Sequence, residues 1–268
     1  MTEWPRWSLM WMLALAVYAT SKALTWRTAH AMNAPKWRHA AYLFAWPGMD
    51  ATAFMQANTT ASCCRVAEWL RALFNLIAGI LLLFVVARTL PSEHVYVAAW
   101  SGMVGLILML HFGAFHLLSC FWRRLDLPAR PLMNRPLASK SLSEFWGRRW
   151  NTAFRDLAHR FVFRPLTSRL GPRVGLVGGF LVSGLVHDLV ISVPAGGGYG
   201  GPTMFFVIQG AAISLERSRL GKRMGLGRGT FGRSFVFAAV IAPLGLLFHR
   251  PFVIGVIVPF MHAIGALP

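Results

Sequence analysis

The chain has 268 residues, of which 56% are apolar and only 13% are charged, and its mean hydropathy is +0.52. This balance excludes a disordered chain and argues against an ordinary soluble domain, in which about 25% of residues are charged. The 27 Lys and Arg residues outnumber the 9 Asp and Glu residues, for a formal net charge of +18. Because these cations lie between long apolar runs, we interpret them as the positive-inside signal of a membrane protein and not as a nucleic-acid-binding surface.

Apolar runs along the chain predict an all-α, polytopic membrane protein with about 7–8 membrane segments. A helix that crosses a bilayer needs about 20 mostly apolar residues. We assign seven such runs, at 8–24, 67–87, 95–120, 174–193, 201–216, 235–249 and 252–267. The first run follows Arg6 and could mimic a signal peptide, but because many apolar runs follow it we interpret it as a membrane anchor.

An eighth apolar run, at 40–56, is interrupted by a Trp-Pro-Gly-Met-Asp sequence at 46–50. Pro and Gly break helices, and a carboxylate is costly in lipid. We therefore expect this run to be re-entrant rather than spanning, which also keeps the basic loop 25–39 on the cytoplasmic side.

The distribution of basic residues predicts which loops face the cytoplasm. Segment 121–173 holds 12 of the 27 Lys and Arg residues and segment 217–234 holds 6, so we expect both inside. The uncharged loop 194–200 is then outside, as is 88–94, whereas 57–66 is inside. The abundance of Ala, Gly and Arg favours a bacterial inner membrane.

The three cysteines are Cys63, Cys64 and Cys120. Two are adjacent, and neither a Cys-x-x-Cys pair nor a zinc-finger spacing occurs. This pattern predicts neither a disulfide framework nor a zinc site.

Segment 121–173 contains a predicted amphipathic helix. Ser141 and Glu144 fit a capping box at its start, with Ser141 as the N-cap. Its apolar positions recur with helical spacing and predict a helix that lies in the membrane interface. These positions are Leu142, Phe145, Trp146, Trp150, Ala153, Phe154, Leu157 and Phe161. On such an unbroken helix Asn151 falls on the opposite, polar face, with Arg148 and Arg155.

The run 174–193 contains two ionisable residues, His187 and Asp188. Such groups are costly in a membrane and usually face a bundle interior or a water-filled cavity. Gly175, Gly179 and Ser183 precede His187 at four-residue intervals, so His187 lies on a stripe of small residues that a neighbouring helix can approach closely. Asp188 lies about 100° around the helix from His187. The residues alone leave open a structural histidine and a functional one.

Residues 141–151, Ser-Leu-Ser-Glu-Phe-Trp-Gly-Arg-Arg-Trp-Asn, resemble a signature of the membrane-bound O-acyltransferase superfamily, in its wax-synthase-like branch. The stretch 180–188, whose His187 lies 36 residues after Asn151, is similar to the family's second signature, a small-residue membrane helix that ends in the catalytic histidine. The stretch 45–50 also resembles this branch. The resemblance covers roughly residues 132–216. The chain is short for the superfamily, and Asp188 stands where many members have Glu.

This resemblance implies an enzyme that transfers a fatty acyl group from a thioester, acyl-CoA, to the hydroxyl of a lipophilic alcohol inside a buried tunnel. His187 matches the catalytic histidine, and neutral imidazole suits the general base that a hydroxyl nucleophile needs. Asn151 matches the family's partner residue and could polarise the developing oxyanion. We expect further substrate-binding side chains, namely Trp146, Arg148, Arg149, Trp150 and Ser183.

The arginines of this segment suit the phosphates of CoA, although they could equally serve topology and interfacial anchoring. The expected partners are acyl-CoA as co-substrate, the alcohol and membrane lipids, with no nucleic acid. We expect no metal and no other cofactor. We also expect one membrane-embedded domain over 1–268, with N-terminal helices to residue 120, the basic segment 121–173 and C-terminal helices from residue 174.

Two alternatives stay open. A small transporter or lipid-binding membrane protein could use His187 and Asp188 as a proton relay, although no inverted repeat is visible. A degenerate family member would bind lipid without turnover, but the intact Asn151 and His187 argue against it.

Overall fold

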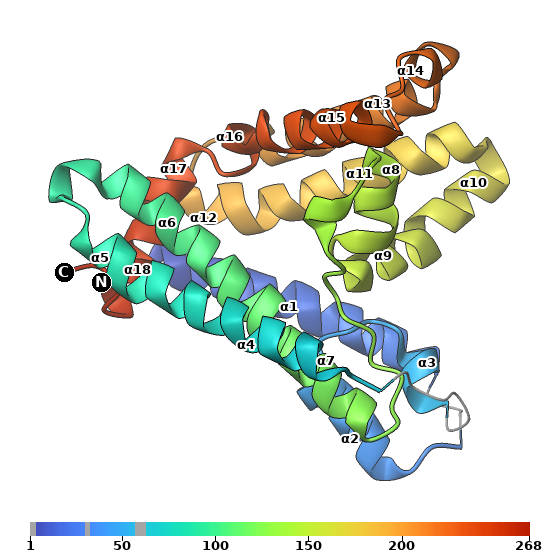
Figure 1. Cartoon of the computed structure of the whole chain (residues 1–268), viewed down its shortest axis with the longest axis horizontal. Helices are drawn as coiled ribbons and strands as arrows, with labels where there is room; N and C mark the ends of the chain where they lie inside the picture. The colour runs from blue at the N-terminus through green and yellow to red at the C-terminus, as the bar shows by residue number, and fades with distance from the viewer. Residues whose placement is uncertain (1–3, 30–32, 57–62) are drawn as a thin grey trace. The chain divides into compact units, whose positions relative to one another are not determined.

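The structure, a computed structural model, describes residues 4–29, 33–56 and 63–268, and every regular element within these ranges is helical (Figure 1). The all-α prediction is therefore confirmed for the described chain. The residues fall into two compact units, the first formed by the chain up to Ala14 with Asn134–Val256, and the second by Leu15–Met133 with Ile257–Pro268. Helix α1 (Arg6–Arg27) begins in the first unit and continues in the second. The single-domain expectation stays a prediction.

Four continuous helical runs are long and apolar enough to cross a membrane, namely Val66–Thr89, Ser92–Arg124, Pro172–Ala195 and Gly229–Leu247. They correspond to four of the seven expected spans. The other three expected spans are not among them. The runs 201–216 and 252–267 form the shorter helices α13 (Gly201–Arg217, 17 residues) and Arg250–Ala263, and the run 8–24 lies in α1, which carries the buried Lys22.

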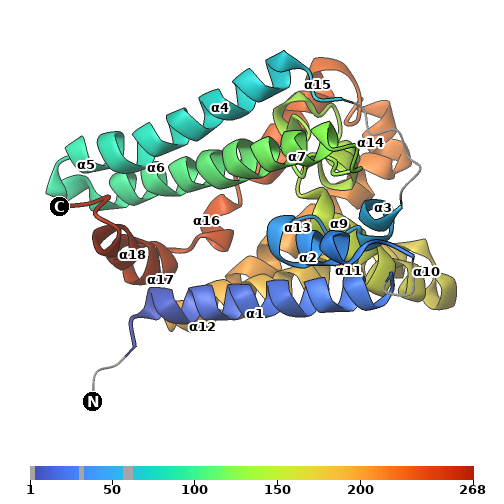
Figure 2. The same cartoon turned by 90° about the horizontal axis from the view of Figure 1, so that it is seen from below.

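The second unit is dominated by a helical hairpin whose two arms run side by side in Figures 1 and 2. One arm is built from α4 (Val66–Leu81), η1 (Leu82–Val86) and α5 (Ala87–Thr89). The other is built from η2 (Ser92–His94), α6 (Val95–Ile107), η3 (Leu108–Ala114) and α7 (Phe115–Arg124). Small residues let the arms approach closely: a Cβ added to Gly79 would overlap the backbone nitrogen of Met109, and one added to Gly105 would lie 2.8 Å from the Gly79 oxygen.

The predicted interruption at 46–50 is confirmed. It separates α2 (Lys36–Ala45) from α3 (Ala51–Met55), and Asp50 caps α3 by accepting the Ala53 N–H at 3.0 Å. Trp46 is only 4% exposed and stacks on Phe54. Whether this segment re-enters the membrane stays a prediction.

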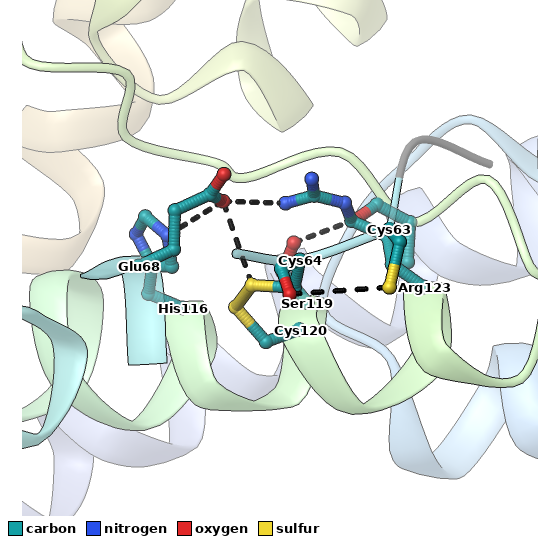
Figure 3. Close-up of a disulfide and its surroundings, with 8 residues drawn as sticks. Cys63, Cys64, Glu68, His116, Ser119, Cys120 and Arg123 are labelled. Atoms are coloured by element: carbon teal, nitrogen blue, oxygen red, sulfur yellow. Dashed lines mark hydrogen bonds and ion pairs between the residues drawn. A yellow bond between two sulfur atoms is a disulfide. The ribbon is translucent and has the colours of Figure 1, made fainter. Parts of the chain in front are cut away.

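One expectation about the cysteines was wrong. Cys64, just before α4, and Cys120, in α7, are joined by a disulfide across a sequence separation of 56 residues (Figure 3). Spacing in the sequence could not reveal the pair, because the register of the helical hairpin is what brings the two residues together. The unit is completed by α18 (Val258–Ala263).

The first unit is a group of helices that carries the segment 141–187. The central pair is α11 (Pro172–His187) and α13, which pack side by side: a Cβ on Gly184 of α11 would lie 2.6 Å from the Thr203 Cα. The helices before α11 are η4 (Pro136–Ala138), α8 (Leu142–Glu144), η5 (Phe145–Arg149), α9 (Thr152–Ala158), η6 (His159–Phe163) and α10 (Arg164–Leu170). Those after it are η7 (Asp188–Ser192), α12 (Val193–Ala195), α14 (Arg219–Arg223), α15 (Gly229–Ile241), α16 (Leu244–Leu247), α17 (Arg250–Phe252) and η8 (Val253–Ile257).

The expected unbroken amphipathic helix over 141–161 was wrong. Helix η5 ends at Arg149, Trp150 is extended, and Asn151 takes a left-handed conformation with φ of +40° before α9 begins. Asparagine is one of the few residues other than glycine that tolerates this region. Because the helix is interrupted at Asn151, the faces of the two helical segments are not in register. The sequence-based placement of Asn151 on the polar face therefore does not hold.

Candidate active site

His187 lies at the C-terminal end of α11, where its ring is oriented by the preceding turn. Its Nδ1 lies 2.7 Å from the Ser183 carbonyl oxygen, and its ring packs on Phe206 of α13 with centroids 4.5 Å apart. A carbonyl oxygen only accepts, so Nδ1 carries the proton and the neutral ring keeps its lone pair on Nε2. This is the tautomer that a general base at Nε2 requires.

Trp146 is held beside the same phenylalanine. Its ring lies 5.7 Å from that of Phe206, and its Nε1 donates to Gln209 Oε1 at 3.1 Å. The fully buried Gln209 in turn donates through Nε2 to the Ala239 carbonyl at 2.8 Å. The structure therefore brings Trp146 and His187 into contact with the same aromatic residue, Phe206. Sequence reasoning missed Phe206 and Gln209, although a lone amide in the apolar run 201–216 was a usable signal.

The start of the first signature is docked on α13 through a buried carboxylate. Glu216, which is 6% exposed, accepts the backbone N–H groups of Leu142 and Ser143. Ser141 Oγ accepts the Glu144 N–H at 3.0 Å, which confirms half of the capping box. In a capping box, Glu144 would also accept the N–H of Ser141. In the structure it accepts the N–H of the preceding residue, Lys140.

Asn151 is the N-cap of α9, and its Oδ1 accepts the Phe154 N–H at 3.4 Å. It follows an aromatic anchor, since Trp150 stacks on Phe145 with ring centroids 5.5 Å apart. Trp150 packs against the core of Leu142, Phe145, Ile213 and Val236. The capping role explains the residue type locally, and the convergence of Asn151 with His187 stays a prediction.

The two arginines of the signature have different surroundings. Arg149 lies 2.7 Å from Glu144 and donates at 3.2 Å to the carbonyl oxygens of both Asn134 and Arg135. Arg148 is exposed and has no hydrogen-bond or ion-pair partner among the described residues. The Arg149 side chain therefore stabilises the chain at 134–135. Of the two arginines, Arg148 is the one whose side chain is available to a ligand.

Ser183 and Gly179 lie on the same face of α11 as His187. The Ser183 hydroxyl donates to the Gly179 carbonyl at 2.9 Å, and the Ser183 carbonyl orients the imidazole. A Cβ added to Gly179 would meet no described atom within 4 Å. The expected close helix approach along this stripe is therefore confirmed at Gly175, where a Cβ would lie 3.0 Å from the Phe163 carbonyl oxygen, but not at Gly179, whose face is open.

Asp188 serves the adjacent helix rather than the imidazole. Its carboxylate accepts the N–H groups of Gly200 and Thr203, at 2.9 and 3.0 Å, at the start of α13, together with the hydroxyls of Thr203 and Ser192. Ser192 is also 3.1 Å from His249 Nε2. A carboxylate with four donors in this arrangement fastens α11 to α13, which supports a structural role and does not favour the proton-relay alternative.

A comparison with protein families gives a match within the segment that carries both signatures. Residues 129–208 match the family described as the membrane bound O-acyl transferase family. This part of the chain is therefore similar to the membrane-bound O-acyltransferases. The match contains both signatures, and together with the four apolar helices it makes the chain an integral membrane protein.

Several plant proteins are similar to part of this chain. Acyl-CoA–sterol O-acyltransferase 1 of Arabidopsis thaliana is 34% identical over 112 residues, which cover 39% of this chain and 29% of that protein. Probable long-chain-alcohol O-fatty-acyltransferase 9 of the same plant is 29% identical over 136 residues, 46% of this chain and 40% of that protein. Long-chain-alcohol O-fatty-acyltransferase of Simmondsia chinensis is 33% identical over 105 residues, 34% of this chain and 29% of that protein.

These names confirm the predicted resemblance to the wax-synthase-like branch. The aligned region spans well under half the length of each of these relatives.

Proposed function

We propose that this protein is an O-acyltransferase that moves a fatty acyl group from acyl-CoA to the hydroxyl of a long-chain alcohol, forming a wax-type ester. The observation that carries the proposal is the orientation of His187, whose Nδ1 is fixed on the Ser183 carbonyl and whose Nε2 is left as the base. Relatives named as long-chain-alcohol and sterol O-acyltransferases support the same reaction class and suggest a lipophilic acceptor.

The proposed reaction needs two groups from the protein: a general base for the alcohol proton, and a hydrogen-bond donor that stabilises the oxyanion of the tetrahedral intermediate. His187 Nε2 takes the proton of the alcohol while its oxygen attacks the thioester carbonyl carbon. The C–O bond forms, the tetrahedral intermediate collapses, and the C–S bond breaks. The departing thiolate takes the proton back from the imidazolium, so CoA leaves as a thiol and the base is regenerated.

The surroundings of His187 fit a lipophilic substrate. The imidazole is flanked by Phe206, and the aromatic contacts continue to Trp146 and Phe180. Apolar walls lower the local polarity, which strengthens the hydrogen bonds made to a developing oxyanion. We propose Asn151 as the donor to that oxyanion and Arg148 as a contact for the CoA phosphates.

The direct test is lipid analysis of cells that make the protein. The cells are supplied with candidate alcohols, and total lipids are compared by mass spectrometry with those of cells that make His187→Ala at the same membrane level. New esters that contain the supplied alcohol, and that are absent from the variant, support the proposal. Equal ester levels in the two strains contradict it.

We also propose a bacterial cytoplasmic membrane as the location, which rests on composition alone.

A further inference from the structure

A second cluster of reactive side chains lies in the other unit, at one end of the helical hairpin. Cys64 and Glu68 are four residues apart at the start of the arm 66–89, and His116 and Cys120 are four residues apart in α7. His116 and Cys120 share a face of α7, whereas Cys64 lies in the non-helical segment just before α4 and Glu68 in the first turn of that helix. The hairpin thus presents a Cys-x-x-x-Glu pair to a His-x-x-x-Cys pair, and Figure 3 shows the four side chains gathered together.

The distances suit a single small ligand. The Sγ of Cys64 lies 3.5 Å from Glu68 Oε2, and His116 Nε2 lies 3.8 Å from the same oxygen. The donor atoms of Cys64, Glu68 and Cys120 all fall within 4.8 Å of one another, and His116 lies outside this group of three, beside Glu68. Ligand atoms bound to one tetrahedral Zn²⁺ at about 2.0–2.3 Å are themselves about 3.3–3.8 Å apart.

His116 provides an independent indication of a ligand. Its Nε2 is buried and makes no hydrogen bond with any described residue, and 3.8 Å to Glu68 exceeds hydrogen-bond reach. A buried polar atom without a partner is costly, so native structures rarely leave one unexplained. A disulfide between Cys64 and Cys120 gives this nitrogen nothing to bind, whereas a metal ion held by the two sulfurs and the carboxylate would offer it a bond once the imidazole turns toward them.

Arg123 supplies the outer support that such a site needs. Its Nη1 donates to Glu68 Oε2 at 2.7 Å. Metal-binding carboxylates are commonly hydrogen-bonded by a second group that holds them in place. The charges also balance: two thiolates and one carboxylate offset a divalent cation and one guanidinium.

We propose that Cys64, Glu68, His116 and Cys120 form a structural Zn²⁺ site when the two cysteines are reduced. A cellular thiol reductant opens the disulfide with two electrons and two protons, giving two thiols. Zn²⁺ then displaces the two thiol protons and binds both sulfurs, the imidazole Nε2 and the carboxylate. The predicted cytoplasmic position of 57–66 and 121–173 places this end of the hairpin in a reducing compartment, where a thiolate site is favoured over a disulfide.

The test uses the full chain, purified in detergent with a thiol reductant and without chelator. Zinc per chain is measured by inductively coupled plasma mass spectrometry for the parent protein, His116→Gln, Cys120→Ser and the control Cys63→Ser. Cys63 is an exposed neighbour of Cys64 outside the proposed ligand set, so it controls for adventitious thiol binding. We expect about one zinc per chain in the parent and in Cys63→Ser, and at least a tenfold loss in the other two.

Replacement of zinc by Co²⁺ gives a readout that does not depend on yield or stability. The parent and Cys63→Ser should show a sulfur-to-cobalt charge-transfer band from two thiolates, and Cys120→Ser should show about half its intensity or none. The proposal is overturned if the reduced parent holds no zinc, if peptide mapping under native reducing conditions finds Cys64 still linked to Cys120, or if zinc is lost from Cys63→Ser but retained in His116→Gln.

Discussion

The imidazole of His187 and the backbone carbonyl of Ser183, one helical turn earlier, lie 2.7 Å apart. This contact makes the ring a donor at Nδ1 and leaves Nε2 as the only basic nitrogen. The backbone of α11 supplies this hydrogen bond, because the helical conformation brings the carbonyl four residues back within reach of the ring. A substitution that distorts this turn should therefore impair the base without removing it.

Asn151 has two roles that a pair of substitutions separates. Asn151→Asp keeps an oxygen for the Phe154 N–H and tolerates positive φ, but it loses the amide donor. Asn151→Gly keeps only the backbone conformation. If the carboxamide donates to the oxyanion, both variants should lose on the order of 10²-fold in kcat.

Thermal unfolding in detergent provides the control for Asn151. Asn151→Asp should unfold near the parent temperature, because its cap is retained. If Asn151→Asp had the kcat of the parent, Asn151 would act only as a helix cap and not as a donor to the oxyanion.

Arg148 and Arg149 should respond differently to the same substitution. Arg148→Gln removes an exposed cation and should raise KM for acyl-CoA about tenfold, with a weaker dependence on salt, while Tm stays unchanged. Arg149→Gln removes the contacts to Glu144 and to the carbonyls at 134–135 and should lower Tm. Initial rates over a salt series and unfolding curves measure both; a reversed pattern would place the CoA contact at Arg149.

Gly179 offers a test of where the acyl or alkyl chain runs. Gly179→Leu fills space that no described atom occupies on the face of His187. Loss of room for one or two CH₂ groups, at about 0.8 kcal/mol each, should lower the rate with long chains about tenfold and leave short chains unaffected.

The matched substitution for Gly179 is Gly184→Leu, on the face that meets α13. There a Cβ would lie 2.6 Å from the Thr203 Cα. This variant should therefore have a lower stability and an unchanged preference for chain length. A Gly179→Leu enzyme with an unchanged chain-length profile would show that the chain lies elsewhere.

Glu144 predicts a pH dependence of stability. The Lys140 N–H, and after it the Arg149 guanidinium, hold the pKa of Glu144 below its ordinary value of 4.5, against the opposing effect of partial burial. A carboxyl group whose folded pKa is lowered stabilises the fold above its unfolded pKa, and this contribution is lost as pH falls through the folded value. The Tm difference between the parent and Glu144→Gln should therefore be largest near pH 7 and shrink below about pH 4.5. A difference that does not vary with pH would mean that the ionised carboxylate does not stabilise the fold.

Local signals in the sequence predicted a good part of the fold. Pro47 and Gly48 indicated the break between α2 and α3, and Ser141 indicated the start of α8. The apolar runs indicated the four long helices. Each of these depends on residues close together in the chain, whose propensities are legible without knowledge of tertiary contacts.

The features that were missed depend on contacts between distant residues. The break at Asn151 accompanies the stacking of Trp150 on Phe145, and the Cys64–Cys120 pair depends on the register of two long helices. The transporter alternative paired Asp188 with His187, but the Asp188 carboxylate accepts the N–H groups of Gly200 and Thr203, which follow a glycine-rich turn. Hydrophobic periodicity does not predict such contacts between residues that are distant in the sequence.

The most direct test of the central claim is acyl transfer by purified protein in lipid nanodiscs, with labelled acyl-CoA and a long-chain alcohol. Ester and free CoA are both quantified for the parent, for His187→Ala, and for His187→Ala with added imidazole. We expect equal amounts of ester and CoA from the parent, a loss of about 10²–10⁴-fold in the variant, and partial recovery with imidazole. Ester formation by His187→Ala at the parental rate would contradict the account.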